Sequence, residues 1–166
     1  MLKNLFDKAA KSRFWLWLTN WILWYKIPFN SPHAIKIVEI GTSSIGLLLP
    51  FKRRNRNHVN SMHACALATV CEYATGLQLG RFLNEKEFRI ILSEIKMVYI
   101  KQARTNVTVS YTLPDSELTE IKRSLEQEPS VIRTLEADLL NTSGEVVCRG
   151  SVTWQIKKWK EVRIKK

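Results

Sequence analysis

The sequence contains few cysteines and no apolar run long enough to cross a membrane. Its three cysteines, Cys65, Cys71 and Cys148, include no Cys-x-x-Cys pair, which argues against a disulfide framework and against a structural zinc site. There is also no metal-ligand cluster, no nucleotide-binding glycine loop and no internal repeat. We therefore expect no metal and no cofactor. A reducing cytoplasm is the simplest setting for unpaired cysteines.

The longest apolar stretch lies near the amino terminus, between Arg13 and Lys26, and holds four of the six tryptophans. It is shorter than the roughly 20 residues that a membrane-spanning helix needs, and no small-residue cleavage site of a signal peptide follows it. We expect one helix over residues 2–26. Two interpretations stay open: packing on the domain or on a dimer mate, or peripheral contact with a membrane surface through tryptophan and lysine.

The stretch from Asn57 to Gly80 predicts a helix that is buried on every side. Alanine, leucine, valine and cysteine occupy nearly every face of it, which is typical of a core helix, and Asn60 or Ser61 is expected to cap its start. His63 and Glu72 interrupt the apolar pattern. Because a buried carboxylate needs a partner or a function, Glu72 is the leading candidate for chemistry, with a solvated structural glutamate as the alternative.

His63 and Glu72 are nine residues apart, which places them on opposite sides of a helix that turns about 100° per residue. One chain therefore cannot easily bring both into one pocket, whereas a two-fold dimer can.

The remaining segments predict an α+β protein with an antiparallel sheet. Alternating and β-branched patterns indicate a hairpin, a long strand, a shorter strand and a final pair of strands, with a short helix before that pair. The expected strands cover residues 35–40, 44–49, 88–102, 107–111, 131–139 and 145–156, and the short helix begins with a cap at Asp115.

The central stretch resembles a motif of the hotdog-fold acyl-CoA thioesterases, most closely those of the phenylacetate-degradation type and related thioesterase-like families. In these families an amide residue precedes a Gly-x-x-His-Gly-Gly turn, and an acidic residue follows on the central helix. Asn57, His63 and Glu72 match these positions, whereas Asn60 and Ala64-Cys65 replace glycines. The resemblance covers most of residues 30–157.

The resemblance implies a hotdog fold, with the sheet wrapped around the central helix, and hydrolysis of an acyl thioester at a site shared by two subunits. Glu72 is expected to act as the general base, helped by His63 and Asn57. The positive end of the central helix is expected to polarise the thioester carbonyl. The expected substrate-binding residues are Asn60, Ala64, Thr75, Gly76, Lys101, Arg104, Arg53, Arg54 and Arg56.

The net charge of +11, from 26 basic and 15 acidic residues, calls for an anionic partner. Coenzyme A, nucleic acid and anionic lipid all meet this requirement. The resemblance favours an acyl-CoA or acyl-carrier thioester as substrate and a homodimer or homotetramer as assembly, with no nucleic acid expected. A hotdog module that binds acyl thioesters or lipids without catalysis is the alternative.

We divide the chain into three parts. Residues 1–29 form a tryptophan-rich helix, residues 30–157 form the thioesterase-like domain, and residues 158–166 form a basic tail.

Overall fold

The core of the molecule is a six-stranded antiparallel sheet with the strand order β1-β2-β4-β5-β6-β3. The structure is a computed structural model, and it describes residues 2–162. Each observed strand lies within a few residues of an expected one. The strands are β1 Lys36–Ile40, β2 Ser44–Leu49, β3 Phe88–Tyr99, β4 Val107–Thr112, β5 Ser130–Leu140 and β6 Val146–Lys158.

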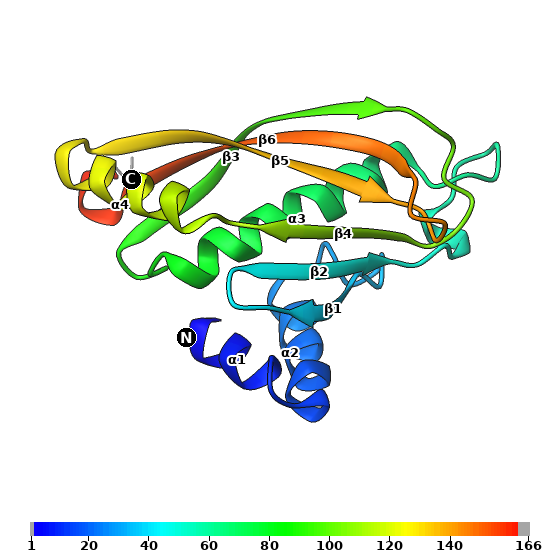
Figure 1. The fold of residues 1–166 in the computed structure, drawn as a ribbon, viewed down its shortest axis with the longest axis horizontal. Coiled ribbons are helices and arrows are strands. Elements are labelled where there is room, and N and C mark those ends of the chain that lie inside the picture. Colours follow the sequence, from blue (N-terminus) through cyan, green and yellow to red (C-terminus); the bar gives the residue numbers. More distant parts are fainter. Residues whose placement is uncertain (1, 163–166) are drawn as a thin grey trace.

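The central helix α3, Ala64–Phe82, contacts five of the six strands, and Figure 1 shows it lying along one face of the sheet. Val70, Ala74 and Leu79 are fully buried in this contact. Burying a side chain of the size of Val70 or Leu79 contributes roughly 1.5–3 kcal/mol. The core therefore fixes this helix, and whatever polar groups it carries, against the sheet. This is the expected arrangement of an antiparallel sheet around one apolar helix.

The amino-terminal segment forms two helices and not the single helix expected. Helix α1 covers Leu2–Ala9 and α2 covers Arg13–Lys26. The break occurs because Ser12 acts as an N-cap, with its hydroxyl accepting a hydrogen bond from the Trp15 amide at 3.5 Å, and such a cap starts a new helix.

Helix α2 covers the outer edge of the sheet at β1 (Figure 1). The Asn20 side chain donates to the Ile37 carbonyl at 3.0 Å and accepts from the Ile37 amide at 2.7 Å. The Trp24 indole donates to the Ile35 carbonyl at 2.7 Å. These bonds replace the partners that a neighbouring strand would supply, so this edge of the sheet is satisfied.

The opposite edge, β3, has no such cover among the described residues. Its side chains are exposed on both faces over much of its length, including Ile91, Leu92 and Val98. An exposed, long, apolar edge strand is a site for pairing with another chain.

The segments that flank these elements complete the fold. Helix α4 spans Asp115–Gln127, and its N-cap is Pro114, so Asp115 is the first helical residue and not the cap. Short 3₁₀ helices cover Arg53–Asn55 and Trp159–Glu161. Of the expected basic tail, Lys158 ends β6, and residues 163–166 lie outside the described residues.

Candidate functional site

The largest cavity lies beside Glu72, between the central helix and the amino-terminal helices. It encloses about 620 Å³. Leu5 of α1 and Ile22 and Ile27 of α2 form part of its wall, and Trp154 of β6 closes another side. A cavity of this size with mostly apolar walls and few polar groups is typical of a small-molecule site.

The Glu72 carboxyl group is the acidic group that α3 brings to this cavity. Burial raises its pKa to about 7, because the charged form loses its hydration. Within residues 2–162 its carboxylate forms no ion pair and no side-chain hydrogen bond. At neutral pH the Glu72 carboxyl group therefore populates both its protonated and its ionised form. A group with this property can accept a proton and return it during a reaction.

Gly76 lies one helical turn after Glu72 and gives room for the Trp154 ring. A methyl group at Gly76 would lie 2.9 Å from the ring and 3.8 Å from a carboxylate oxygen of Glu72. The Trp154 indole donates to the Thr75 hydroxyl at 3.0 Å, and this hydroxyl donates to the Glu72 carbonyl at 3.0 Å. Gly76 therefore lines the cavity as expected, whereas Thr75 lies behind it and holds Trp154.

The loop that leads into α3 is shaped by Asn57. Its side-chain oxygen accepts from the amides of Val59 and Ser61 at 3.1 and 3.0 Å. Asn60 adopts a positive φ of 57°, a conformation that asparagine tolerates better than most residues. This explains how asparagine can occupy a position where the resemblance has glycine.

His63 is the N-cap of α3, so the expectation of Asn60 or Ser61 in this role was wrong. Its Nδ1 accepts from the Cys65 amide at 3.1 Å, and its own amide donates to the Asn55 carbonyl at 2.8 Å. His63 has extended φ and ψ, so it lies outside the helix. The helical rotation of about 100° per residue therefore does not give the direction of its side chain.

The Ala64 amide is the first N–H of α3, and within the described chain it donates to no protein group. It lies at the positive end of the helix dipole, and such amides stabilise developing negative charge on an oxygen. A second cavity of about 340 Å³ is lined by Asn57, Ala64, Tyr99 and Lys101. The Tyr99 hydroxyl donates to the Ala64 carbonyl at 3.1 Å.

Of the basic candidates, Lys101 lines this second cavity, and most of the set already have protein partners. Lys101 pairs with Glu145 at 2.5 Å, and Arg104 donates to the Gln102 side chain at 3.0 Å. Arg54 donates to the Pro32 carbonyl, and Arg56 donates to Asn60. Arg53 is exposed on the 3₁₀ turn.

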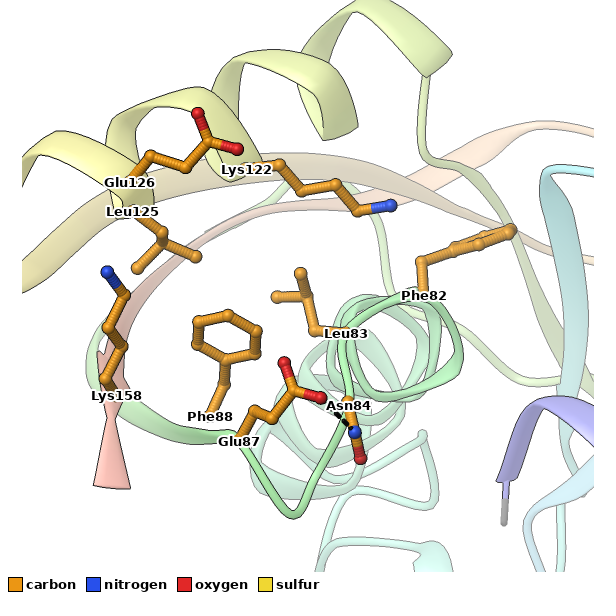
Figure 2. A pocket seen from close by; sticks show the side chains of 9 residues that line it. All are labelled: Phe82, Leu83, Asn84, Glu87, Phe88, Lys122, Leu125, Glu126 and Lys158. Carbon is orange, nitrogen blue, oxygen red and sulfur yellow. Dashed lines mark hydrogen bonds between the residues drawn. The ribbon is translucent and has the colours of Figure 1, made fainter. Parts of the chain in front are cut away.

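The cavity at Glu72 and the cavity at Ala64 have no lining residue in common. One chain therefore presents the Glu72 carboxylate and the Ala64 amide to separate cavities. A third cavity of about 340 Å³ lies where α3 ends, with Leu83, Phe88 and Leu125 pointing toward one another (Figure 2). It contains none of the expected catalytic residues. The described residues include no group of three or more potential metal ligands.

The model of the family described as "Domain of unknown function (DUF4442)" matches residues 16–156. The chain belongs to this family. The DUF4442 match begins within α2 and ends within β6, so it includes Glu72 at the first cavity and Ala64 at the second. No curated protein matches the chain.

Several solved structures share the fold. A protein of unknown function from Pseudomonas aeruginosa, described as a "Probable Thioesterase", has a TM-score of 0.78 and 22% identity over 85% of this chain and 94% of its own. A Haemophilus influenzae thioesterase has a TM-score of 0.68 and 16% identity over 86% of this chain and 90% of its own.

A Staphylococcus aureus thioesterase has a TM-score of 0.61 and 13% identity over 78% of this chain and 98% of its own. The chain described here, a member of the DUF4442 family, therefore has the hotdog fold that the resemblance implied.

Proposed function

We propose that this protein hydrolyses acyl thioesters, with acyl-CoA as the favoured substrate class, at sites shared by the two subunits of a homodimer. The observation that carries the proposal is Glu72. It is a carboxylate without an ion-pair partner in the described structure, its pKa is raised to about 7 by burial, and it lies at an apolar cavity large enough for an acyl group.

In the proposed reaction, the Glu72 carboxylate accepts a proton from water as the water oxygen bonds to the thioester carbonyl carbon. The Ala64 amide of the partner subunit donates a hydrogen bond to the resulting oxyanion. When the intermediate collapses, the carbon–sulfur bond breaks and the thiolate takes the proton back from Glu72. The products are a carboxylic acid and a free thiol, and His63 and Asn57 keep the donor amide in place through the loop they shape.

Two features support a shared site. The base and the donor amide of one chain line separate cavities, so a second chain is needed to bring them together. In addition, β3 is an uncovered edge strand with exposed Ile91, Leu92 and Val98. Pairing of β3 with its copy about a two-fold axis would extend the sheet across the dimer, and two such dimers could form a tetramer.

The spacing of two residues also supports the catalytic assignment. In the Staphylococcus aureus thioesterase, solved variants replace a glutamine and a glutamate that are fifteen positions apart. In this chain Asn57 and Glu72 are separated by the same interval, with Asn57 in the loop before the central helix and Glu72 on the helix itself. This parallel favours Asn57 as the amide residue of the site.

The basic residues near Ala64 suit the phosphates of coenzyme A. Lys101, Arg104 and the turn with Arg53, Arg54 and Arg56 flank the second cavity or the loop beside it, and the chain has a net charge of +11. An acidic acyl-carrier protein would meet the same charges. The three free cysteines fit a reducing cytoplasm.

A specific observation favours a second candidate, an acyl-thioester-binding protein without turnover. Where the resemblance has two glycines, Ala64 and Cys65 carry side chains, and the Cys65 amide is already bonded to His63. Only one amide of the turn remains open to an oxyanion, which weakens the stabilisation of the intermediate.

The test is the release of free thiol from short-, medium- and long-chain and aromatic acyl-CoAs. Wild type, Glu72→Ala and the control Glu128→Ala are compared, since Glu128 is exposed and lies in neither cavity. Loss of turnover in Glu72→Ala alone supports the hydrolase. Turnover that persists in Glu72→Ala refutes the mechanism, and tight acyl-CoA binding without thiol release by wild type identifies the binding protein.

A further inference from the structure

Helix α2 carries a row of exposed aromatic side chains along its outer face. Phe14, Trp17, Trp21 and Tyr25, which we term the aromatic stripe, are 63%, 55%, 55% and 84% exposed. They recur at intervals of three or four residues, so they lie on one side of the helix. The ring centroids of Phe14 and Trp17 are 6.0 Å apart, and those of Trp17 and Trp21 are 6.2 Å apart. Phe14, Trp17 and Trp21 therefore form one continuous apolar surface, and Tyr25 lies one turn further along the same side of the helix.

The stripe cannot turn inward, because the opposite face of α2 is fixed to the domain. Thr19 and Leu23 are buried, and the hydrogen bonds of Asn20 and Trp24 tie the helix to the backbone of β1. Phe29, just beyond the helix, adds a further side chain that is 69% exposed. Apolar surface that is gathered in one place and held outward marks an interaction site.

The segment that carries the stripe is rich in positive charge. Between residues 2 and 29 the one acidic residue is Asp7, which lies 3.7 Å from the buried guanidinium of Arg81. Lys8 stacks over the Trp15 ring at 4.5 Å from its centroid. The basic residues of this segment are Lys3, Lys8, Lys11, Arg13 and Lys26.

We propose that the aromatic stripe docks this protein on the surface of an anionic phospholipid bilayer, with α2 lying in the plane of the membrane. Tryptophan and tyrosine rings favour the headgroup zone, and lysine and arginine beside them are attracted to anionic lipid. No helix in the described part of the chain is long and apolar enough to cross a membrane, which agrees with attachment at the surface.

Charge also argues against a second copy of the chain as the occupant. Two stripes facing each other about a two-fold axis would place like charges of the two copies together, Lys11, Arg13 and Lys26 in each. A bilayer with phosphatidylglycerol offers the opposite charge. Docking requires no thioester chemistry, so it can be tested apart from hydrolysis.

The experiment is cosedimentation of the full chain with vesicles of phosphatidylcholine alone or mixed with phosphatidylglycerol. We expect binding to the anionic vesicles only. Trp17→Ser combined with Trp21→Ser should weaken that binding at least about tenfold, because both rings leave the interface. The matched control, Val59→Ser with Ile132→Ser, removes side chains that are 45% and 58% exposed elsewhere and should bind as wild type does.

A second pair of variants tests the charges. Lys11→Glu with Arg13→Glu should abolish binding, whereas Lys122→Glu with Arg123→Glu, which makes the same change in net charge on α4, should not. Equal loss in both pairs would mean nonspecific attraction by the net charge, and it would overturn the proposal. Two other results would also overturn it: undiminished vesicle binding by the Trp17 and Trp21 variant, or conversion of a soluble oligomer to smaller species by that variant in sedimentation velocity.

Discussion

The two candidate regions of helix α3, its start at Ala64 and its middle at Glu72, differ in accessibility and in polarity. At its start, the Ala64 amide is exposed at the positive end of the helix and is open to an acceptor. Two turns later, Glu72 faces an apolar cavity, and burial raises its pKa to about 7. A donor of this kind must be accessible, whereas a base of this kind gains its strength from being withdrawn from water.

In the proposed mechanism, one buried helix serves two chemical purposes that require different surroundings. The start of α3 follows a polar loop that Asn57 holds in place by hydrogen bonds. The middle of α3, at Glu72, is enclosed by Trp154 and the amino-terminal helices. Because the two regions line separate cavities, we expect them to work together only across two subunits.

The strongest test of this division combines two damaged chains. Ala64→Pro removes the donor N–H, and proline is tolerated at the first position of a helix. We expect this variant and Glu72→Gln each to lose about 10²–10³-fold in activity. Co-expressed with two different tags and purified as the mixed dimer, they should recover up to about half of wild-type activity, because each mixed dimer carries one intact site and one doubly damaged site.

Recovery is measured as thiol release by the doubly purified mixed dimer. If the mixed dimer is as inactive as its parents, the base and the donor act within one chain, and the shared site is wrong.

The pH dependence of activity distinguishes the contribution of Glu72 from that of the Ala64 amide. Because Glu72 must be ionised to accept a proton and its pKa is about 7, activity should rise up to that pH and then level off. At pH 5 we expect kcat/KM to be about 100-fold below its plateau. The residual activity of Ala64→Pro should keep the same midpoint, since the amide does not titrate. A midpoint near 4.5 would show that Glu72 is solvated.

The stability of the fold should also depend on Glu72. Its pKa is raised from 4.5 to about 7 in the folded state, so the unfolded chain loses this proton first as pH rises. The free energy of unfolding therefore falls between those two values and is constant above them. Glu72→Gln should be more stable than wild type by up to about 3 kcal/mol at pH 8 and equal to it at pH 4.

Urea unfolding at one protein concentration measures this difference, with Glu128→Gln as the control. If the difference in stability between Glu72→Gln and wild type is the same at pH 8 as at pH 4, the Glu72 carboxylate has a partner.

The smallest effect is expected at the helix start. Ala64→Gly with Cys65→Gly restores the glycines of the resemblance and opens the donor amide to the substrate, so turnover should rise, by up to about tenfold. Each glycine costs the helix up to about 1 kcal/mol, and Ala68→Gly controls for that cost. Unchanged turnover would mean that access to the amide does not limit the reaction.

The sequence predicted the fold well because its strongest patterns are local. Alternation in β5 and β6 and the apolar run of α3 each follow from neighbouring residues, and the structure confirms them. The break between α1 and α2 was missed because residues 8–13 contain no proline or glycine, and the new helix starts at a single serine cap.

The site was predicted only in part because several of its contacts join distant positions. Trp154 alternates inward along β6, but nothing in the pattern pairs it with Thr75, 79 positions away. The pairing of Lys101 with Glu145 joins positions that are 44 residues apart. The roles of Glu72, His63 and Asn57 remain predictions, although Glu72 and Asn57 now lie at defined cavities.

The open edge of β3 would also tie catalysis to the abundance of the protein. If pairing along this edge assembles the site, a newly made chain holds a base without a donor and a donor without a base. It becomes competent only on meeting another copy. At dilutions where dimers are scarce, halving the number of chains would lower the number of working sites about fourfold. A small change in expression would therefore cause a larger change in the rate of thioester hydrolysis.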